Sequence, residues 1–171
     1  MTRFKIQYSN HQVLISLNKS NVKDIVVNYF YTKMLNDPIS FATLSILPST
    51  YDPNKPVYML NLWKYRKEAS YRREHVHLAG HACTGKEALG RYRAAIAPLL
   101  PPNTSVIFSS TILAKIVVAE NEDWDFVAIL RYETLEGFKK TVESKEYREE
   151  VEPHRLVGLE DGRLIALDKL E

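Results

Sequence analysis

The feature that most constrains the fold is a strand in which both faces are apolar. Residues 57–65, VYMLNLWKY, follow Pro56 as an almost continuous run of apolar and aromatic side chains, which is typical of a strand. Successive side chains point to opposite faces of a strand. One face therefore carries Val57, Met59, Asn61, Trp63 and Tyr65, and the other carries Tyr58, Leu60, Leu62 and Lys64. Neither set is polar enough for water, so we expect both faces to be covered.

The segments after this strand alternate between helical and extended patterns. Residues 84–100 predict a helix with a Thr84–Glu87 capping box, and a second helix begins after Thr134. The patterns of residues 105–118, 124–132 and 163–169 predict strands. We expect Glu152-Pro153 to interrupt the secondary structure. The order strand–helix–strand–strand–helix–strand is the split βαβ arrangement. It predicts an α+β, ferredoxin-like fold with a four-stranded antiparallel sheet.

Two helices can cover only one face of such a sheet, so the other face would expose a large apolar patch. A second copy of the chain is the simplest cover, and we expect a homodimer. The alternative cover is the N-terminal extension. In the dimer, the space enclosed by the two sheets is where we expect a substrate.

Residues 1–50 form an extension, and residues 51–171 form the ferredoxin-like domain. The extension carries a weak hairpin pattern over residues 4–17 and a helical pattern from Val22 to Met34. Four prolines within residues 37–56 indicate a connector with one short helix.

Composition restricts the partners and the compartment. The 171 residues carry a net charge of +2, from 23 basic and 21 acidic side chains, which gives no broad footprint for nucleic acid or an anionic membrane. No apolar stretch approaches the ~20 residues of a membrane span. We find no signal peptide pattern, and the single cysteine, Cys83, excludes an intrachain disulfide. These features predict a cytoplasmic protein.

Several motifs resemble those of one family of dimeric α+β barrel proteins. They are MLNL at residues 59–62, GKEALGRY at 85–92, EDWD at 122–125 and HRLVGLEDGRLI at 154–165. The family is of uncharacterised function and is related to antibiotic-biosynthesis monooxygenases and polyketide-cyclase barrels. The resemblance covers about residues 45–170 and implies a dimeric barrel. It also implies chemistry such as cofactor-independent oxygenation, cyclisation, isomerisation or decarboxylation, with haem in some members.

Two residues are the first candidates for catalysis. His154 follows Pro153 in an expected non-helical connection and falls within the HR tail motif, so it is a candidate proton donor or acceptor; alternatively it bonds backbone groups at a helix end. Asn61 is an amide within an apolar strand. It either orients a substrate oxygen or satisfies a neighbouring loop.

A second set of candidates would contact the substrate. Trp63 and Tyr65 share the side of Asn61 and could form an aromatic wall or plain core. Tyr92 lies on the apolar face of its helix, where it is core unless its hydroxyl reaches a ligand. Asp125 and Arg131 share one side of their strand and point into solvent or into a polar cavity.

Residues 66–83 are polar and predict a long loop, which could act as a lid. Its histidines and Cys83 are metal-ligand types, but their spacing matches no strong motif, so we expect no metal. In a lid, His75 or His81 could act as a general base.

Together these features predict an isomerase, cyclase or lyase that needs no cofactor and moves a proton on a hydrophobic, oxygenated natural-product intermediate. The alternatives are a cofactorless or haem-dependent monooxygenase and a non-enzymatic ligand-binding dimer.

Overall fold

The computed structural model describes residues 2–8, 11–17, 39–47, 51–120 and 122–170, in two compact units, Met1–Leu35 and Asn36–Glu171. The first unit contains strands β1 (Thr2–Tyr8) and β2 (His11–Leu17), which pair antiparallel. This pairing confirms the hairpin predicted near the start of the chain. The expected helix from Val22 to Met34 lies outside the described residues.

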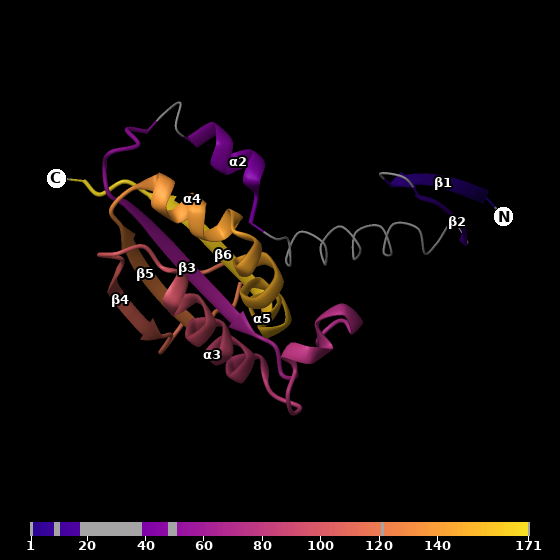
Figure 1. Ribbon diagram of the computed structural model, residues 1–171. Helices are drawn as coiled ribbons and strands as arrows, with labels where there is room; N and C mark the ends of the chain where they lie inside the picture. Colours follow the sequence, from indigo (N-terminus) through magenta and orange to yellow (C-terminus); the bar gives the residue numbers. More distant parts are fainter. Residues whose placement is uncertain (1, 9–10, 18–38, 48–50, 121, 171) are drawn as a thin grey trace. The chain divides into compact units, whose positions relative to one another are not determined.

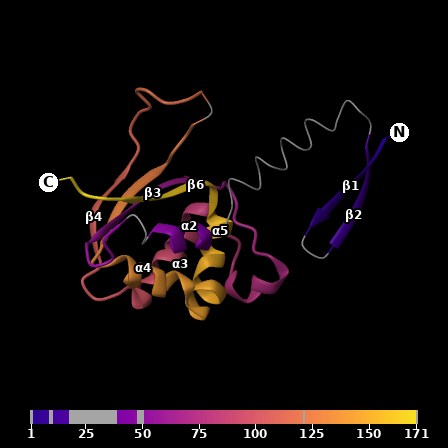
Figure 2. The same ribbon diagram turned by 90° about the horizontal axis from the view of Figure 1, so that it is seen from above.

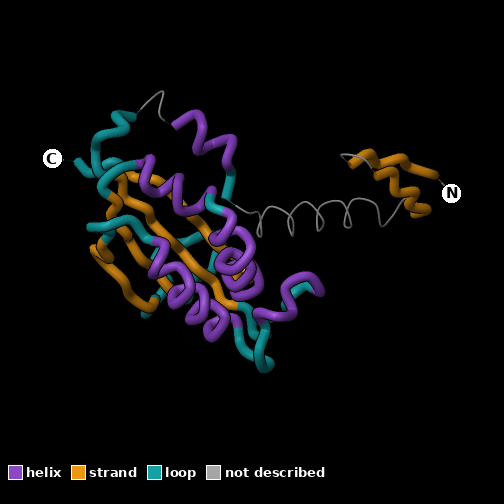
Figure 3. The backbone as a smooth tube through the Cα atoms, viewed as in Figure 1, coloured by secondary structure: helices purple, strands orange, loops and turns teal. Residues whose placement is uncertain are grey.

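The second unit is an α+β fold with a four-stranded antiparallel sheet, as predicted (Figure 1 and Figure 3). The strand order is β4-β5-β3-β6. Its strands are β3 (Val57–Tyr65), β4 (Ser105–Thr111), β5 (Phe126–Tyr132) and β6 (Leu159–Leu167). Its helices are α2 (Phe41–Ile46), α3 (Gly85–Ile96), α4 (Leu135–Glu143) and α5 (Glu152–Gly158), with short 3-10 helices η2 (Arg73–Leu78) and η3 (Ala97–Leu99) and a π-helical turn η4 (Tyr147–Val151).

The α-helices of this unit lie on one face of the sheet (Figure 2), and the hydrophobic core lies between them and the strands. The start of α3 is fixed by the predicted capping box, in which Thr84 and Glu87 bond each other's backbone N–H groups. Thr134 caps α4 through the backbone N–H of Gly137 (3.1 Å). The core is formed chiefly by Val57, Met59, Tyr132, Leu135, Phe138, Val142, Tyr147 and Val151.

The opposite, helix-free face of the sheet is apolar, as the strand pattern predicts. Register places Leu60 between Ile129 of β5 and Ile165 of β6, and Phe108 of β4 lies beside Ile129. Phe108 is 50% exposed and Ile165 is 42% exposed. The segment between β4 and β5 rises on this same side of the sheet (Figure 2) and also carries exposed apolar side chains.

The structure differs from the sequence prediction in two places, the end of β4 and the long loop of residues 66–83. The strand predicted over residues 105–118 ends at Thr111. Beyond it the alternating pattern continues, but none of the described strands lies beside it to accept its hydrogen bonds, and Leu113 and Val117 are more than 90% exposed. The long loop of residues 66–83 contains η2 and one isolated bridge, Ala69 to Cys83.

The expected break at Glu152-Pro153 was wrong, because these residues open α5. Proline is tolerated in the first turn of a helix, where its missing N–H has no helical partner anyway. The last strand also begins earlier than expected, at Leu159. Asp161 and Gly162 therefore lie within β6.

Candidate functional site

A cavity of about 320 Å³ lies between the helices and the sheet. Its walls come from the inward faces of all four strands and from α3, α4 and α5. Most of the lining is apolar or aromatic, and the polar groups are few, which is typical of a small-molecule site. The described lining residues that carry polar side chains are Asn61, Trp63, Tyr92, Arg93, Ser109, Tyr132 and Arg155.

This position differs from the expected one. The sequence places a substrate between two sheets, but the cavity lies on the helix-covered face of one sheet. The helix-free face carries a hollow lined by Tyr58, Ile107, Ile129, Leu167, Asp168 and Lys169. The aromatic residues of β3 predicted to line a site face the helices, so the surface expected for dimerisation and the candidate binding site are separate.

Asn61 and Trp63 supply hydrogen-bond donors from β3, as period-two spacing predicts. The Asn61 Nδ2 donates to the Met59 carbonyl (3.1 Å), which leaves its second N–H for a ligand. Trp63 is 5% exposed, and its Nε1–H has no hydrogen-bond partner among the described residues. Its ring packs against Tyr92 and Phe126, at centroid distances of 6.0 and 5.0 Å. Trp63 lines the cavity, and a buried N–H without a partner in such a residue is a candidate ligand donor.

Two tyrosines also line this cavity. Tyr92 lies on α3, as predicted, and Tyr132 at the end of β5 is 4% exposed. Burial raises the pKa of both phenols, strongly for Tyr132. Both therefore stay protonated at neutral pH and act as hydrogen-bond donors or proton donors, not as bases.

Arg155 is one of the polar lining residues that sequence reasoning missed, together with Arg93, Ser109 and Tyr132. It lies on α5, is 8% exposed, and reaches the cavity from the helix side. A signal was available, since Arg155 follows His154 in the HR motif. The sequence pattern did not predict a helix at Pro153. Only in a helix do His154 and Arg155 point about 100° apart, so that Arg155 faces the cavity and His154 does not.

His154 lies elsewhere, although it is buried at 7% exposure. Its Nδ1 shares a 2.6 Å hydrogen bond with the Tyr71 hydroxyl, and the two rings meet edge to face. Burial and the nearby Arg91 charge lower the pKa of His154, so the imidazole is neutral at pH 7. It is not among the lining residues of the cavity. The contact ties α5 to the long loop.

The loop histidines also lie apart from the cavity. His75 is half-buried within η2, while His81 is exposed and its carbonyl accepts a hydrogen bond from Arg91 (3.3 Å). Arg91 also bonds the Ala79 carbonyl, so it holds the loop against α3. In the described part of the chain no three His, Cys, Asp or Glu side chains are grouped as a metal site would need.

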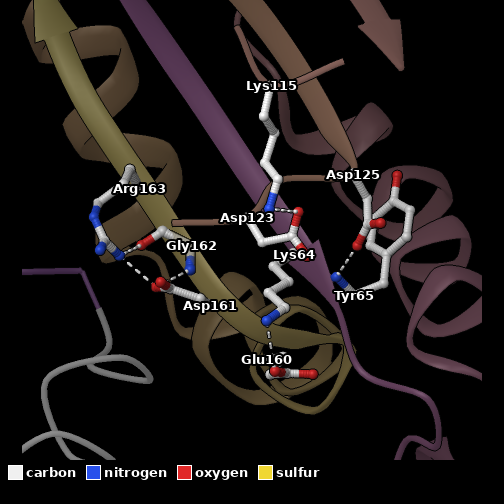
Figure 4. A network of polar contacts seen from close by, with 9 residues as sticks. All are labelled: Lys64, Tyr65, Lys115, Asp123, Asp125, Glu160, Asp161, Gly162 and Arg163. Carbon is white, nitrogen blue, oxygen red and sulfur yellow. Dashed lines mark hydrogen bonds and ion pairs between the residues drawn. The ribbon is translucent and has the colours of Figure 1, made fainter. Parts of the chain in front are cut away.

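Tyr65, Asp125 and Arg131 lie outside the cavity lining as well. The Asp125 carboxylate accepts the backbone N–H of Tyr65 (2.6 Å), and the Asp125 N–H donates to the Trp63 carbonyl (2.8 Å). Figure 4 shows this contact beside the Lys64–Glu160 and Lys115–Asp123 ion pairs. Arg131 lies on the helix-free face of the sheet, away from the cavity, and forms an ion pair with Glu133 (2.6 Å). The Asp125 contacts fasten the end of β3.

Comparisons with known proteins indicate the fold and no activity. No family model and no curated protein matches the sequence. The solved structures similar to this chain include that of RPA0582 from Rhodopseudomonas palustris, described as a protein of unknown function, with a TM-score of 0.66 and 28% identity over 80% of this chain and 98% of the other. A methylated form of RPA0582 gives a TM-score of 0.66 and 29% identity over 80% of this chain and 95% of the other. Among the described residues, no helix is both long and apolar enough to cross a bilayer.

Proposed function

We propose that this chain is an enzyme of small-molecule metabolism, an isomerase, cyclase or lyase that works without a cofactor on a hydrophobic, oxygenated compound. The observation that supports this most is the collection of hydrogen-bond donors around an apolar cavity. The Trp63 N–H has no described partner, and Asn61 and Tyr92 lie on the same cavity wall or beside it.

Donors fixed in an apolar cavity stabilise negative charge on a bound oxygen more strongly than water does. In the proposed reaction, a carbonyl oxygen binds near Asn61 and Trp63 and gains negative charge as a water molecule or a basic group of the substrate removes a proton from the neighbouring carbon. The neutral phenols of Tyr92 and Tyr132 add donors, because their raised pKa keeps them protonated.

A second candidate is a ligand-binding protein without turnover. It is favoured by one specific observation: the described lining residues include no His, Cys, Asp or Glu. The cavity therefore has no side chain that readily accepts a proton at neutral pH. A reaction would need His154 to reach the cavity from its bond with Tyr71, or a base supplied by the substrate or by water.

We place the chain, as part of the same proposal, among the dimeric α+β barrel proteins and in the cytoplasm. A second copy packs on the helix-free face, where Phe108 and Ile165 are exposed. Because the cavity lies on the other face, each copy carries its own site.

Binding and exchange of a simple ketone test this function. We choose 2-acetonaphthone, whose flat apolar body and single carbonyl suit the cavity. Titration is expected to quench tryptophan fluorescence, and NMR in D₂O is expected to detect faster loss of the methyl protons next to the carbonyl. Asn61→Leu removes a donor and is expected to slow exchange about tenfold or more. Asn54→Leu, at an exposed position, is the matched control.

Three outcomes separate the candidates. Binding with accelerated exchange supports the enzyme. Binding without exchange supports the ligand-binding protein. If 2-acetonaphthone does not bind, or binds equally well after Trp63→Phe and Asn61→Leu, the donor-lined cavity is not the site.

A further inference from the structure

The charged side chains of the cavity are all of one sign. Of the described lining residues, Arg93 and Arg155 carry charge, and no acidic residue lines the cavity. Arg93, on α3, lies over the ring of Phe126 at 5.7 Å, and Phe126 itself forms part of the wall. Arg155 is the more buried of the two. An apolar cavity with two cations and no anion on its wall attracts a negatively charged ligand.

Arg155 has no close acidic partner. None of the ion pairs or hydrogen bonds found among the described residues involves its guanidinium. Arg155 is 8% exposed, and the charge of a residue that buried is normally paired, because taking a charge out of water is unfavourable unless it finds a partner. The unpaired state of Arg155 therefore indicates a partner that binds from the cavity.

Glu152 is the nearest candidate for an internal partner, one helical turn before Arg155 on α5. The two interact electrostatically but form no ion pair, and the Glu152 Oε1 has no described hydrogen-bond partner. Burial raises the pKa of the Glu152 carboxyl, which weakens it as a counter-charge. Glu152 does not line the cavity. The positive charge thus remains available on the cavity side.

We propose that the ligand of this cavity is a hydrophobic carboxylic acid, whose carboxylate pairs with Arg155 and whose apolar body lies against Trp63 and Phe126. This inference rests on the proposed function of the cavity and names the chemical class of its ligand. The planar guanidinium holds a carboxylate through two parallel hydrogen bonds, which a neutral amide does not match. The volume of about 320 Å³ is near the lower end for ligand pockets, so it fits a one-ring or medium-chain acid.

A pair of probes that differ at one end tests this class. 4-Phenylbutanoate and 4-phenylbutanamide have nearly the same shape, and only the first is an anion at pH 7. Calorimetric titration of the full chain is expected to give at least about tenfold tighter binding of the carboxylate, since hydrogen bonds to a charged partner are the stronger ones. Arg155→Met, which keeps most of the side-chain volume, is expected to reduce that preference to about twofold.

Two further variants keep the test decisive. Arg155→Lys retains a positive charge without the planar guanidinium and is expected to show an intermediate carboxylate preference. It provides the test by itself if circular dichroism shows that Arg155→Met does not fold. Arg73→Met, at an exposed position of η2, is the matched control and is expected to keep the full preference.

Each result bears on one claim. Equal affinity of the two probes for the wild type overturns the carboxylic-acid inference but leaves the proposed cavity function standing. A carboxylate preference that persists in both Arg155 variants also overturns it, because another group would then select the anion. If neither this pair nor 2-acetonaphthone binds, the proposed function falls and the inference falls with it.

Discussion

His154 and Arg155 are neighbours in the chain, yet α5 directs them to different partners. Arg155 lines the cavity, whereas His154 bonds Tyr71 of the long loop. Asn61 and Trp63, by contrast, reach the same cavity because residues two apart on a strand share a face. The direction of a side chain could therefore be predicted from the sequence only where the type of secondary structure was predicted correctly. Asn61 and Trp63 share a face of β3, as period-two spacing predicts, whereas the HR motif lies on a helix that the sequence pattern did not predict.

The His154–Tyr71 contact predicts a pH dependence of stability. The folded-state pKa of His154 lies below its usual value of 6.5, so the unfolded chain binds this proton more readily. The stabilisation is complete above pH 6.5 and is lost as the pH falls through the lowered folded pKa. Denaturant titrations from pH 5 to 8 are expected to give a smaller free energy of unfolding at the acid end.

His154→Phe is expected to flatten this part of the pH profile. It should also lower the free energy of unfolding at pH 7.5 by about 1–2 kcal/mol, because the hydrogen bond to Tyr71 is lost. The exposed His81→Gln is the control and is expected to keep the wild-type profile. Identical pH profiles for wild type and His154→Phe would show that this imidazole does not link stability to pH.

Three elements meet where β3 ends, and two glycines permit their close approach. The Arg66 N–H donates to the Gly158 carbonyl at the end of α5 (2.9 Å), and the Gly85 N–H donates to the Arg66 carbonyl at the start of α3 (3.0 Å). A Cβ on Gly85 would lie 2.3 Å from the Gly158 oxygen. This junction fixes the ends of α3 and α5, whose side chains line the cavity.

Gly85→Ala is expected to destabilise the fold, because the added methyl group would have to displace backbone atoms. We expect a loss of roughly 2 kcal/mol or more in the free energy of unfolding, measured by urea denaturation. Gly90→Ala, within the same helix, is the matched control. A Cβ there meets nothing within 4 Å, so alanine should stabilise the helix by up to about 1 kcal/mol. Equal effects at both positions would contradict close packing at the junction.

At the scale of the whole molecule, the helix-free sheet face and the segment after β4 present apolar surface on the same side (Figure 2). Ile107 is 55% exposed on the sheet, and Ile116 is 88% exposed on the segment. Scattered exposed apolar side chains are ordinary, but a continuous patch usually marks a binding surface. The proposed occupant is a second copy of the chain.

Phe108→Glu tests that occupant. A charge in the centre of an apolar interface would be buried without a partner, so we expect the dimer to dissociate. Size-exclusion chromatography with light scattering should give twice the chain mass for the wild type and one chain mass for the variant. Val76→Glu, at a 64% exposed position on η2, should leave the dimer intact. Binding of 4-phenylbutanoate is expected to survive in Phe108→Glu, since the cavity lies on the other face. A wild type that is already monomeric contradicts the proposal.

The sequence by itself determined the features that depend on local periodicity and capping. These are the two-sided strand β3, the capped starts of α3 and α4, the α+β strand order and the apolar helix-free face. Tertiary structure alone decided what depends on a neighbour. Residues 112–118 alternate like a strand but pair with no strand in the described part of the chain, and Pro153 opens a helix because α5 packs against α3. The same packing brings Arg155 to a cavity with Asn61 and Trp63, nearly a hundred residues away, and no local pattern records such a meeting.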